Sequence, residues 1–582
     1  MLKKIGRILK SICTFLGAIV LLSWAVFAWF GWKNSTAEEV SEKTALVIDF
    51  NTNYSENNNQ SILDELLQKE TVSLQKLVQA IEIAAADDRV QALVAKLSTT
   101  DLEFAQIQDI ARAVSHFRQS GKKTYVFSQG FGPLGQGNRE YYLATFFEKI
   151  YMQPHTSIGL TGIGMEVPFV KDVLAKIGVQ PEFYSRYEYK TAMMSLTDDK
   201  MSAEYREELQ KLGSALWQEL EHDIQNNRPL KEKPAAIRNR APITAEEGKE
   251  LGMIDELLYL PEAEQRIKED GIENFADITD YAALLHPNEG DVPVVAWLNL
   301  NGIIDSGKTS EDIDGEYVVG SESVGADIAA IAEIDNLKAV VVRIDSPGGS
   351  YHAADEIYFA LKKLKTDKKI PIVISQSGYA ASGGYFISLA GDYILAEPTT
   401  ITGSIGVLGG KVSLQELWHK LGVSWETVKV GDNADILSVN KPFSAAERKI
   451  FNASLDDVYR DFTAKVAENR KLRQDINKIA RGRVWIGRQA VDLGLVDGLG
   501  GYGDALMKAK ELAGLQPTDA ISLVSYPLEK TFAEKIQDFL LNGNITADKL
   551  VMQKGGVVDI RHLKLFKRLQ YDTVLAPFMI KM

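Results

Sequence analysis

Residues 370–386 read IPIVISQSGYAASGGYF, a β-branched run that leads into a cluster of very small residues. The first part, Ile370–Ser375, has the composition of a buried strand. In the second part Ser382 lies between Ala381 and Gly383, which are too small to shield its hydroxyl. Ser382 is therefore a candidate nucleophile.

The same alternation of strand and helix patterns extends to both sides of this stretch. We expect further strands and helices, in chain order, at Val294–Leu300, Ala326–Glu333, Ala339–Ile344, Ala353–Lys365 and Tyr393–Ala396, the second and fourth being helical. Strands that alternate with helices indicate an α/β fold with largely parallel strands.

The chain also contains a long internal duplication. Residues of the first half match residues of the second half at one offset of 244 positions, and a later segment matches at 242. A period this long indicates a duplicated domain, because solenoid units repeat every 20–50 residues or so. The matches are Pro154 with Pro398, Gly159 with Gly403, Gly162 with Gly406, Ile177–Val179 with Leu421–Val423, and Gly252–Asp255 with Gly494–Asp497.

The two copies retain different chemistry. The counterpart of Ser382 in the first copy is Asn138, which cannot act as a nucleophile. The counterpart of Lys190, at the end of the first-copy segment Tyr187–Lys190, is Ala434. A serine in one copy and a lysine in the other predict one composite site, and neither copy should be active alone.

Composition limits the classes of function. The chain has 582 residues, too many for one hydrophobic core, and a net charge of −14. This acidic balance argues against nucleic acid as a partner, because phosphate binding needs a basic surface. The single cysteine, Cys13, excludes a disulfide framework or a thiolate metal site within one chain. We expect no cofactor and no metal ion.

An uncharged stretch of 22 residues, Ser11–Trp32, lies near the N-terminus. It is long enough to cross the hydrocarbon core as a helix. Four basic residues precede it and aromatic residues crowd its far end, which predicts a cytoplasmic N-terminus and a body outside the cytoplasm. A cleavable signal peptide is the alternative, but its apolar region would be shorter, about 7–15 residues, and would end in small residues.

These features predict a division of the chain into six parts. They are a cytoplasmic N-terminus (1–10), a transmembrane anchor (11–32), a linker (33–43), an N-terminal repeat (44–286), a C-terminal repeat (287–514) and a tail without an assigned role (515–582).

Two more loops of the second copy could assemble chemistry around Ser382. The loop Asp345–Ser350 contains Gly349, whose backbone N–H could face an oxyanion, as could the N–H of Gly383. The loop Thr400–Gly406 could place Ser404 close to Ser382. Each loop alone also fits ordinary turn chemistry or tight helix packing.

A serine nucleophile needs a base, and the residues leave two candidates open. His352 is the only histidine near a motif, but it more naturally begins the following helix. Lys190 is the alternative, since serine–lysine pairs are a variant of the triad. Burial would have to lower the lysine pKa by about 3 units, at a cost of about 4 kcal/mol to the charged form.

Four motifs in order resemble the signal peptide peptidase A family, in its long bacterial form with two repeats and an N-terminal anchor. They are Ser346–Ser350 (SPGGS), Ala380–Tyr385 (AASGGY), Thr402–Gly406 (TGSIG) and Ala490–Asp497 (AVDLGLVD). The resemblance implies a β-β-α spiral fold shared with Clp protease and crotonase, duplicated in tandem. It also implies a serine endopeptidase of the bacterial inner membrane, with a periplasmic body, that degrades signal-peptide remnants and other apolar peptides.

The resemblance also implies roles for individual residues. Ser382 would be the nucleophile, Lys190 the general base and Ser404 the residue that orients the lysine, while Gly349 and Gly383 would supply the oxyanion N–H groups. It further implies a dome-like homotetramer. Two alternatives are a crotonase-like acyl-CoA enzyme and a catalytically inactive membrane scaffold.

Overall fold

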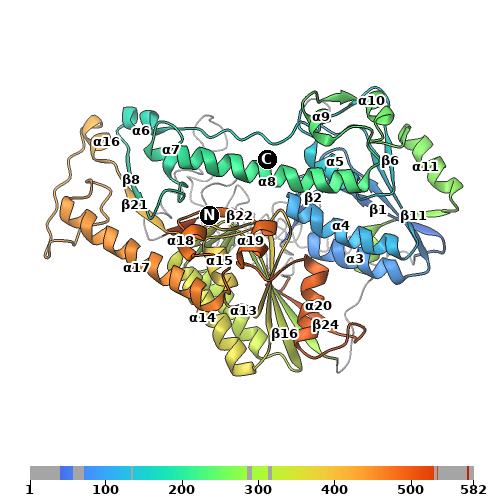
Figure 1. Cartoon of the computed structure of the whole chain (residues 1–582). Coiled ribbons are helices and arrows are strands. Elements are labelled where there is room, and N and C mark those ends of the chain that lie inside the picture. The colour runs from blue at the N-terminus through green and yellow to red at the C-terminus, as the bar shows by residue number, and fades with distance from the viewer. Residues whose placement is uncertain are drawn as a thin grey trace, which may run out of the picture.

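Figure 1 shows the computed structural model of the chain, which describes residues 40–56, 71–132, 135–284, 292–311, 317–529, Glu534 and 573–575. The predicted anchor, residues 11–32, lies outside the described residues. Among the helices that are described, none has the length and apolarity needed to span a membrane.

The N-terminal repeat is built on a six-stranded parallel sheet in the order β10-β6-β5-β4-β1-β11. Apolar residues of its inner strands are fully buried, and helices α3, α4 and α5 pack nearby. The bounds are β1 Thr44–Asp49, β4 Val90–Lys96, β5 Lys123–Ser128, β6 Lys149–Met152, β10 Glu256–Leu257, β11 Asn274–Asp277, α3 Leu74–Ala86, α4 Phe104–Gln119 and α5 Asn138–Ala144.

The C-terminal repeat has the corresponding sheet, ordered β22-β20-β18-β16-β12-β24, with β19 and β23 branching from β18. All its pairs are parallel except β20 with β22. The bounds are β12 Val294–Asn301, β16 Leu337–Ser346, β18 Ile372–Ala381, β19 Tyr393–Ala396, β20 Ile401–Gly403, β22 Val484–Ile486, β23 Gly498–Leu499 and β24 Ser522–Tyr526, with helices α13 Ser321–Ala332, α14 Tyr351–Lys368, α15 Gly383–Ser388 and α20 Tyr502–Leu512.

A third sheet joins the two repeats in the order β14-β15-β13-β17-β25-β21-β8. Six of these strands come from the second half of the chain, and β8 comes from the first repeat. The bounds are β8 Gln180–Ser185, β13 Ile303–Asp305, β14 Ser310–Glu311, β15 Tyr317–Gly320, β17 Gly348–Ser350, β21 Leu408–Ser413 and β25 Thr573–Leu575.

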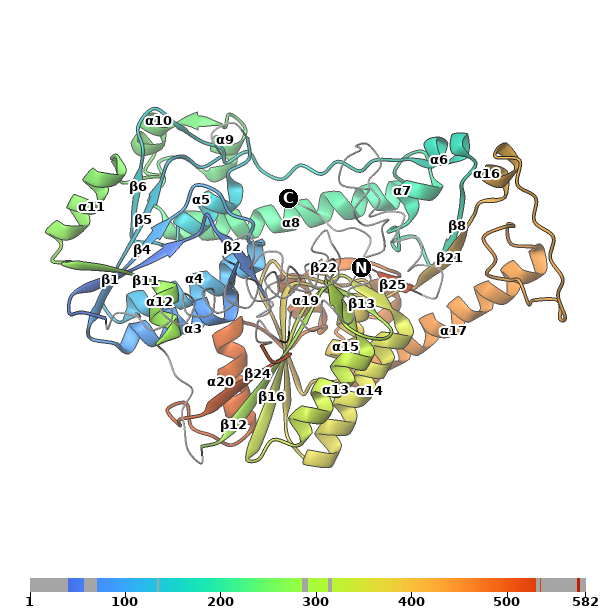
Figure 2. The same ribbon diagram turned by 180° about the vertical axis from the view of Figure 1, so that it is seen from behind.

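Two long helices of 25 residues each repeat the duplication, α8 (Ala203–Asn227) and α17 (Ala445–Asn469). Each begins after a serine that caps a free backbone N–H, Ser202 or Ser444. Figures 1 and 2 show α8 passing from α7 (Met194–Thr197) across β22 to the body of the first repeat. Helix α8 therefore ties the two repeats together.

The core runs across the boundary between the repeats. Trp297 of β12 belongs to the same buried cluster as the first-repeat helices and stacks on Tyr502 with ring centroids 3.9 Å apart. Arg343, which is fully buried, bonds Glu56 at 2.9 Å and also pairs with Asp109, both from the first repeat. The repeats consequently form one folding unit rather than two independent domains.

Shorter elements complete the described structure. They are β2 Asn53–Ser55, β3 Thr71–Ser73, β7 Ser157–Ile158, α6 Lys171–Ile177, α9 Pro234–Arg238, β9 Ile243–Thr244, α10 Ala245–Glu250, α11 Leu260–Glu269, α12 Ile278–Ala283, α16 Gln415–Lys420, α18 Ile476–Ile479 and α19 Gly487–Leu493.

The expected α/β class and the alternating elements of the second copy are present. The strand expected at Ile370–Ser375 extends further, as β18, to the residue before Ser382. Beyond Gly514, β24 pairs with β12 as β11 pairs with β1. The first part of the tail, to which the sequence assigned no role, thus completes the sheet of the second repeat.

Candidate active site

Ser382 lies at the junction between β18 and α15. Its backbone has φ 56° and ψ −111°, a conformation that non-glycine residues rarely adopt. Its N–H donates to the Gly403 carbonyl at 2.8 Å, and its carbonyl accepts from the Phe386 N–H at 2.8 Å. A strained backbone conformation of this kind persists only where the surrounding structure holds it, as these two hydrogen bonds do at Ser382.

Strand pairing brings Lys190 across to Ser382. β8 pairs antiparallel with β21, from Gln180 opposite Ser413 to Ser185 opposite Leu408. One residue further, the Arg186 N–H donates to the Val407 carbonyl at 2.9 Å. Because β21 begins just after the Ser404 loop, the chain reaches that loop at Lys190, four residues after Arg186.

The loop before β22 holds the lysine backbone in place. Gly482, at φ 89°, approaches so closely that a Cβ there would lie 2.5 Å from the Lys190 nitrogen. Its N–H donates to the Ile405 carbonyl at 2.8 Å, and the Tyr189 N–H donates to the Arg481 carbonyl at 3.3 Å. This loop leaves the lysine little freedom to move away from Ser382.

The Lys190 amine has three polar partners. Its Nζ lies 2.7 Å from Ser382 Oγ, 3.0 Å from Ser404 Oγ and 3.0 Å from the Ser404 carbonyl oxygen. A neutral amine has two N–H donors and one lone pair, so it can donate twice to Ser404 and accept the Ser382 hydroxyl proton. An uncharged Lys190 can therefore keep all three contacts.

Burial favours that uncharged form. Lys190 is 3% exposed, and Ser382 and Ser404 are not exposed at all. Loss of hydration lowers the pKa of Lys190 well below its ordinary value. Asp198 and Asp199, which would oppose this effect if they were close, are exposed.

Two glycines, Gly349 and Gly383, lie close to one another next to Ser382. Gly349 has φ 155°, and a Cβ there would overlap the Ile304 carbonyl oxygen at 1.9 Å, so the close approach requires glycine. A Cβ on Gly383 would lie 3.2 Å from the Gly349 nitrogen, which places these two backbone segments side by side.

The structure brings together all five residues that the sequence predicts for the site, namely Lys190, Gly349, Ser382, Gly383 and Ser404. Gly349 and Gly383 have no side chains, so only their backbone groups are available to the site. The alternative base, His352, is exposed at the second residue of α14, and the position next to the Ser382 hydroxyl is occupied by Lys190. Lys190 and Ser382 belong to the same chain, so the two repeats meet at this site within one molecule.

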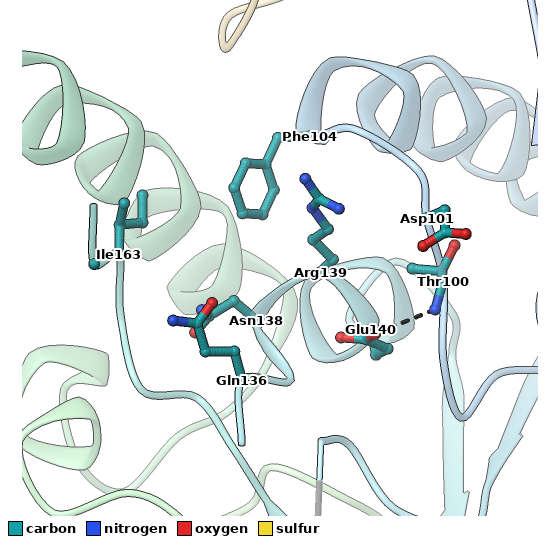
Figure 3. A pocket seen from close by; sticks show the side chains of 9 residues that line it. Thr100, Asp101, Phe104, Gln136, Asn138, Arg139, Glu140 and Ile163 are labelled. Atoms are coloured by element: carbon teal, nitrogen blue, oxygen red, sulfur yellow. Dashed lines mark hydrogen bonds between the residues drawn. The ribbon is translucent and has the colours of Figure 1, made fainter. Parts of the chain in front are cut away.

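The corresponding place in the first repeat holds a different arrangement. Asn138 is buried, and its side-chain amide donates to the Gly162 carbonyl at 2.8 Å while accepting from the Gly162 N–H at 3.0 Å. Beside it lies a cavity of about 190 Å³, lined among others by Phe104, Arg139 and Glu140 (Figure 3). Asn138 therefore clamps a loop where its counterpart Ser382 faces a lysine.

Two contributions to the site could not be expected from the motifs. The Ser404 carbonyl oxygen is a partner of Lys190 as close as the Ser404 hydroxyl, but a backbone group leaves no signature in the sequence. The supporting loop at Arg481 and Gly482 is also outside the motifs. Its one signal is the combination of glycine and basic residues in Ala480–Arg483 (ARGR), which by itself indicates only a turn.

Comparison with known proteins agrees with this geometry. The family model described as "Peptidase family S49" matches residues 94–272 and 364–516, and the one described as "Clp protease" matches residues 317–400. The second repeat accordingly has a Clp protease-like α/β fold.

Three curated relatives extend over most of the chain. It is 27% identical to Protease 4 of Haemophilus influenzae, covering 87% of this chain and 85% of that protein. It is 32% identical to Protease 4 of Salmonella typhi (82% and 77% covered) and 28% identical to the chloroplastic serine protease SPPA of Arabidopsis thaliana (78% and 68% covered). With more than half of its length matched by the family model and these relatives covered over two thirds or more, the chain belongs to peptidase family S49 and is a serine peptidase.

Proposed function

We propose that this peptidase is a membrane-anchored endopeptidase that uses Ser382 as nucleophile and Lys190 as general base to degrade released signal peptides and other apolar peptides. The observation that supports the dyad best is the 2.7 Å distance between Lys190 Nζ and Ser382 Oγ, with both groups buried. A neutral lysine at hydrogen-bond distance from a serine hydroxyl satisfies the geometric requirement for a nucleophile and its base.

The reaction begins when the neutral Lys190 amine takes the Ser382 proton while Oγ attacks the scissile carbonyl carbon. The N–H groups of Gly349 and Gly383 hold the resulting oxyanion, and Ser404 accepts from the lysine ammonium. The ammonium then gives its proton to the leaving amine, which departs and leaves an acyl-enzyme on Ser382. Water, deprotonated by Lys190, releases the acyl group and restores the serine hydroxyl.

The dyad is tested by the rate at which a serine-reactive fluorophosphonate labels the protein. We expect labelling of the wild type at Ser382 and none in Ser382→Ala. Lys190→Met, which keeps the length of the side chain but removes the base, should label about 10²–10⁴ times more slowly. His352→Ala is the matched control and should label normally. If His352→Ala lost labelling while Lys190→Met labelled normally, the general base would be His352 and not Lys190.

The apolar segment Ser11–Trp32 supports the membrane anchor. With basic residues before it, it favours a cytoplasmic N-terminus and a catalytic body in the periplasm of a bacterial inner membrane. Deletion of residues 1–33 should release the protein from the membrane fraction during alkaline extraction. A full-length protein that alkaline extraction also releases would contradict the anchor.

We propose that identical copies assemble into a ring, a tetramer. Two stretches support this proposal, because their counterparts in the other repeat pair as strands and they themselves do not. Within one chain β8 pairs with β21. At the repeat offset of 244, their counterparts are residues 424–429 and 164–169, and neither stretch is a strand in the described part of the chain. Residues 421–434 are all exposed, with Val428 99% exposed and Val430 97% exposed.

We infer that residues 424–429 of one copy pair with residues 164–169 of the next. Such a head-to-tail contact uses two different surfaces and closes into a ring when the rotation between copies allows it. Val428→Glu should shift the sedimentation of the detergent-solubilised protein from tetramer toward monomer. Ile83→Glu, on the exposed face of α3, is the matched control. A wild type that sediments as a monomer would exclude the ring.

A further inference from the structure

A buried glutamate of the first repeat contacts the second repeat close to the dyad. Glu208 of α8 is 4% exposed, and its Oε1 accepts a hydrogen bond from the Val484 N–H at 2.6 Å. Val484 is the first residue of β22, which α8 crosses in Figure 1. The contact therefore joins the two repeats, as the contact between Lys190 and Ser382 does.

The segment 482–484 is held at each of its three residues. Gly482 lies against the Lys190 backbone, and the Arg483 carbonyl accepts the Ser404 N–H at 2.7 Å. Val484, the third residue, donates to Glu208. Glu208 thus anchors the end of a short segment whose other two residues contact the lysine and the serine that bonds it.

The same turn of α8 also contacts the chain just before the lysine. Glu207 accepts from the Tyr189 hydroxyl at 3.4 Å and pairs with Arg483 at 3.9 Å. The Arg483 guanidinium lies 3.6 Å from the centroid of the Tyr189 ring. Because Tyr189 directly precedes Lys190, α8 meets the lysine segment and the segment 482–484 together.

The internal duplication shows that the fold does not need this pair. β9 pairs with β7 in the register of β22 with β20, so Pro242 is the counterpart of Val484 and has no N–H to donate. At the same offset of 242 positions, the counterpart of Glu208 on α17 is Ile450, which has no acceptor. The donor and the acceptor are therefore absent together from the other copy, although its helix and strand form.

The carboxyl group is also poorly suited to a purely stabilising role. Burial raises the pKa of Glu208 to about 7, although the Val484 N–H and the Arg483 guanidinium act to lower it. Its Oε2 has no hydrogen-bond partner among the described residues, and burial of such an oxygen is destabilising. A proton on Oε2 leaves Oε1 free to accept, so the contact with Val484 persists in the neutral form.

We propose that Glu208 is a positioning residue of the dyad, whose Oε1 holds the segment 482–484 against Lys190 and Ser404. Glu208 acts through this segment and does not touch the reacting atoms. The proposal rests on the proposed function of Lys190 as the general base. It makes the first repeat the source of both the base and the group that fixes its support.

Replacement of the acceptor predicts a specific kinetic effect. Glu208→Ala should lower kcat for an internally quenched peptide of Ala and Leu by about 10-fold with KM unchanged, because the amine is displaced and the substrate contacts are not. Glu208→Gln keeps an acceptor oxygen for the Val484 N–H and should have a kcat close to that of the wild type. A kcat for Glu208→Gln as low as that of Glu208→Ala would overturn the role of the acceptor.

Glu447→Ala is the matched control for the loss of a buried glutamate. Glu447 lies on α17, is 2% exposed and accepts the Ser444 N–H at 2.8 Å. We expect this variant to unfold at lower denaturant concentration but to keep the wild-type kcat per folded molecule. An equal fall of kcat in Glu447→Ala and Glu208→Ala would assign the effect to general destabilisation and overturn the proposal.

Hydrogen exchange in the Ser382→Ala protein tests the support of the lysine without any catalysis. Addition of Glu208→Ala should accelerate exchange at the amides of Gly482, Val484 and Ser404, and leave that of α17 unchanged. A failure of the proposed dyad would remove the kinetic effect but not this one, so the two failures are distinguishable. Unchanged exchange at these amides, or a wild-type kcat in Glu208→Ala of an active enzyme, would overturn the proposal.

Discussion

At the scale of single residues, the site depends on a lysine kept away from water. The hydrogen-bond partners of Lys190 are two serines rather than a carboxylate. A carboxylate would favour the ammonium form, whereas burial alone lowers the lysine pKa. The unusual backbone conformation of Ser382 also serves the dyad, because it directs the serine hydroxyl toward the Lys190 amine.

The pH dependence of kcat/KM follows from that lowered pKa. The base works only when neutral, so kcat/KM should rise with pH as Lys190 in the free enzyme loses its proton. Because the pKa lies well below its ordinary value of 10.5, the rise should be complete well before that pH. A steady-state pH profile with the quenched peptide measures it. A rise centred near 10.5 would contradict the buried, neutral lysine.

Ser404→Ala tests the positioning of the lysine. Loss of the hydroxyl removes one acceptor for the ammonium, which should move the acidic limb of the pH profile to lower pH. Misorientation of the amine should lower kcat by about 10-fold, corresponding to about 1.4 kcal/mol. Ser388→Ala is the control, because Ser388 is equally buried but bonds the Gly384 carbonyl. If the acidic limb of Ser404→Ala lay at the same pH as that of the wild type, Ser404 would not act on Lys190.

Asn138 is expected to be structural. Asn138→Ala would leave the buried N–H and carbonyl of Gly162 without their partner, which costs about 1–3 kcal/mol. Denaturant unfolding should show this loss of stability, while fluorophosphonate labelling of Ser382 stays as in the wild type. A loss of labelling in a protein that is still folded would mean that Asn138 acts in catalysis.

At the scale of elements, short loops rather than helices set the geometry. The Gly482 loop presses on the Lys190 backbone, so Gly482→Ala should displace the base. We expect kcat to fall by about 10-fold or more. Gly514→Ala is a matched control with a similar φ of 75° but open space around the new Cβ. Equal kcat values for the two variants would show that the loop does not position the lysine.

The parts of this site that could be predicted from sequence are those that depend on side-chain identity. The serine, the lysine and Ser404 could be inferred from motifs, and the strand that leads to Ser382 from its apolar run. The Ser404 carbonyl and the approach of Gly482 could not, because they depend on backbone positions that the tertiary fold sets. The position of the C-terminal segment was equally hidden, since three residues of strand have no detectable periodicity.

At the scale of the whole molecule, each of the two repeats depends on the other for its structure. The first repeat supplies β8 to a sheet of the second, and the second supplies Trp297 to the core of the first. Arg343 is buried against carboxylates from the other repeat, and a buried cation without its partners is strongly destabilising. Each repeat expressed alone should therefore aggregate or remain unfolded by circular dichroism, and neither should label with the fluorophosphonate.

Each active site, in our proposal, joins Lys190 and Ser382 of one chain. The most direct measurement is peptide cleavage by mixed oligomers of Ser382→Ala and Lys190→Met chains, with a different affinity tag on each and purification over both. Because each chain lacks half of its own dyad, we predict no cleavage above that of the single variants. Recovery of a substantial fraction of wild-type activity would show that the lysine of one chain serves the serine of another, which would contradict the account.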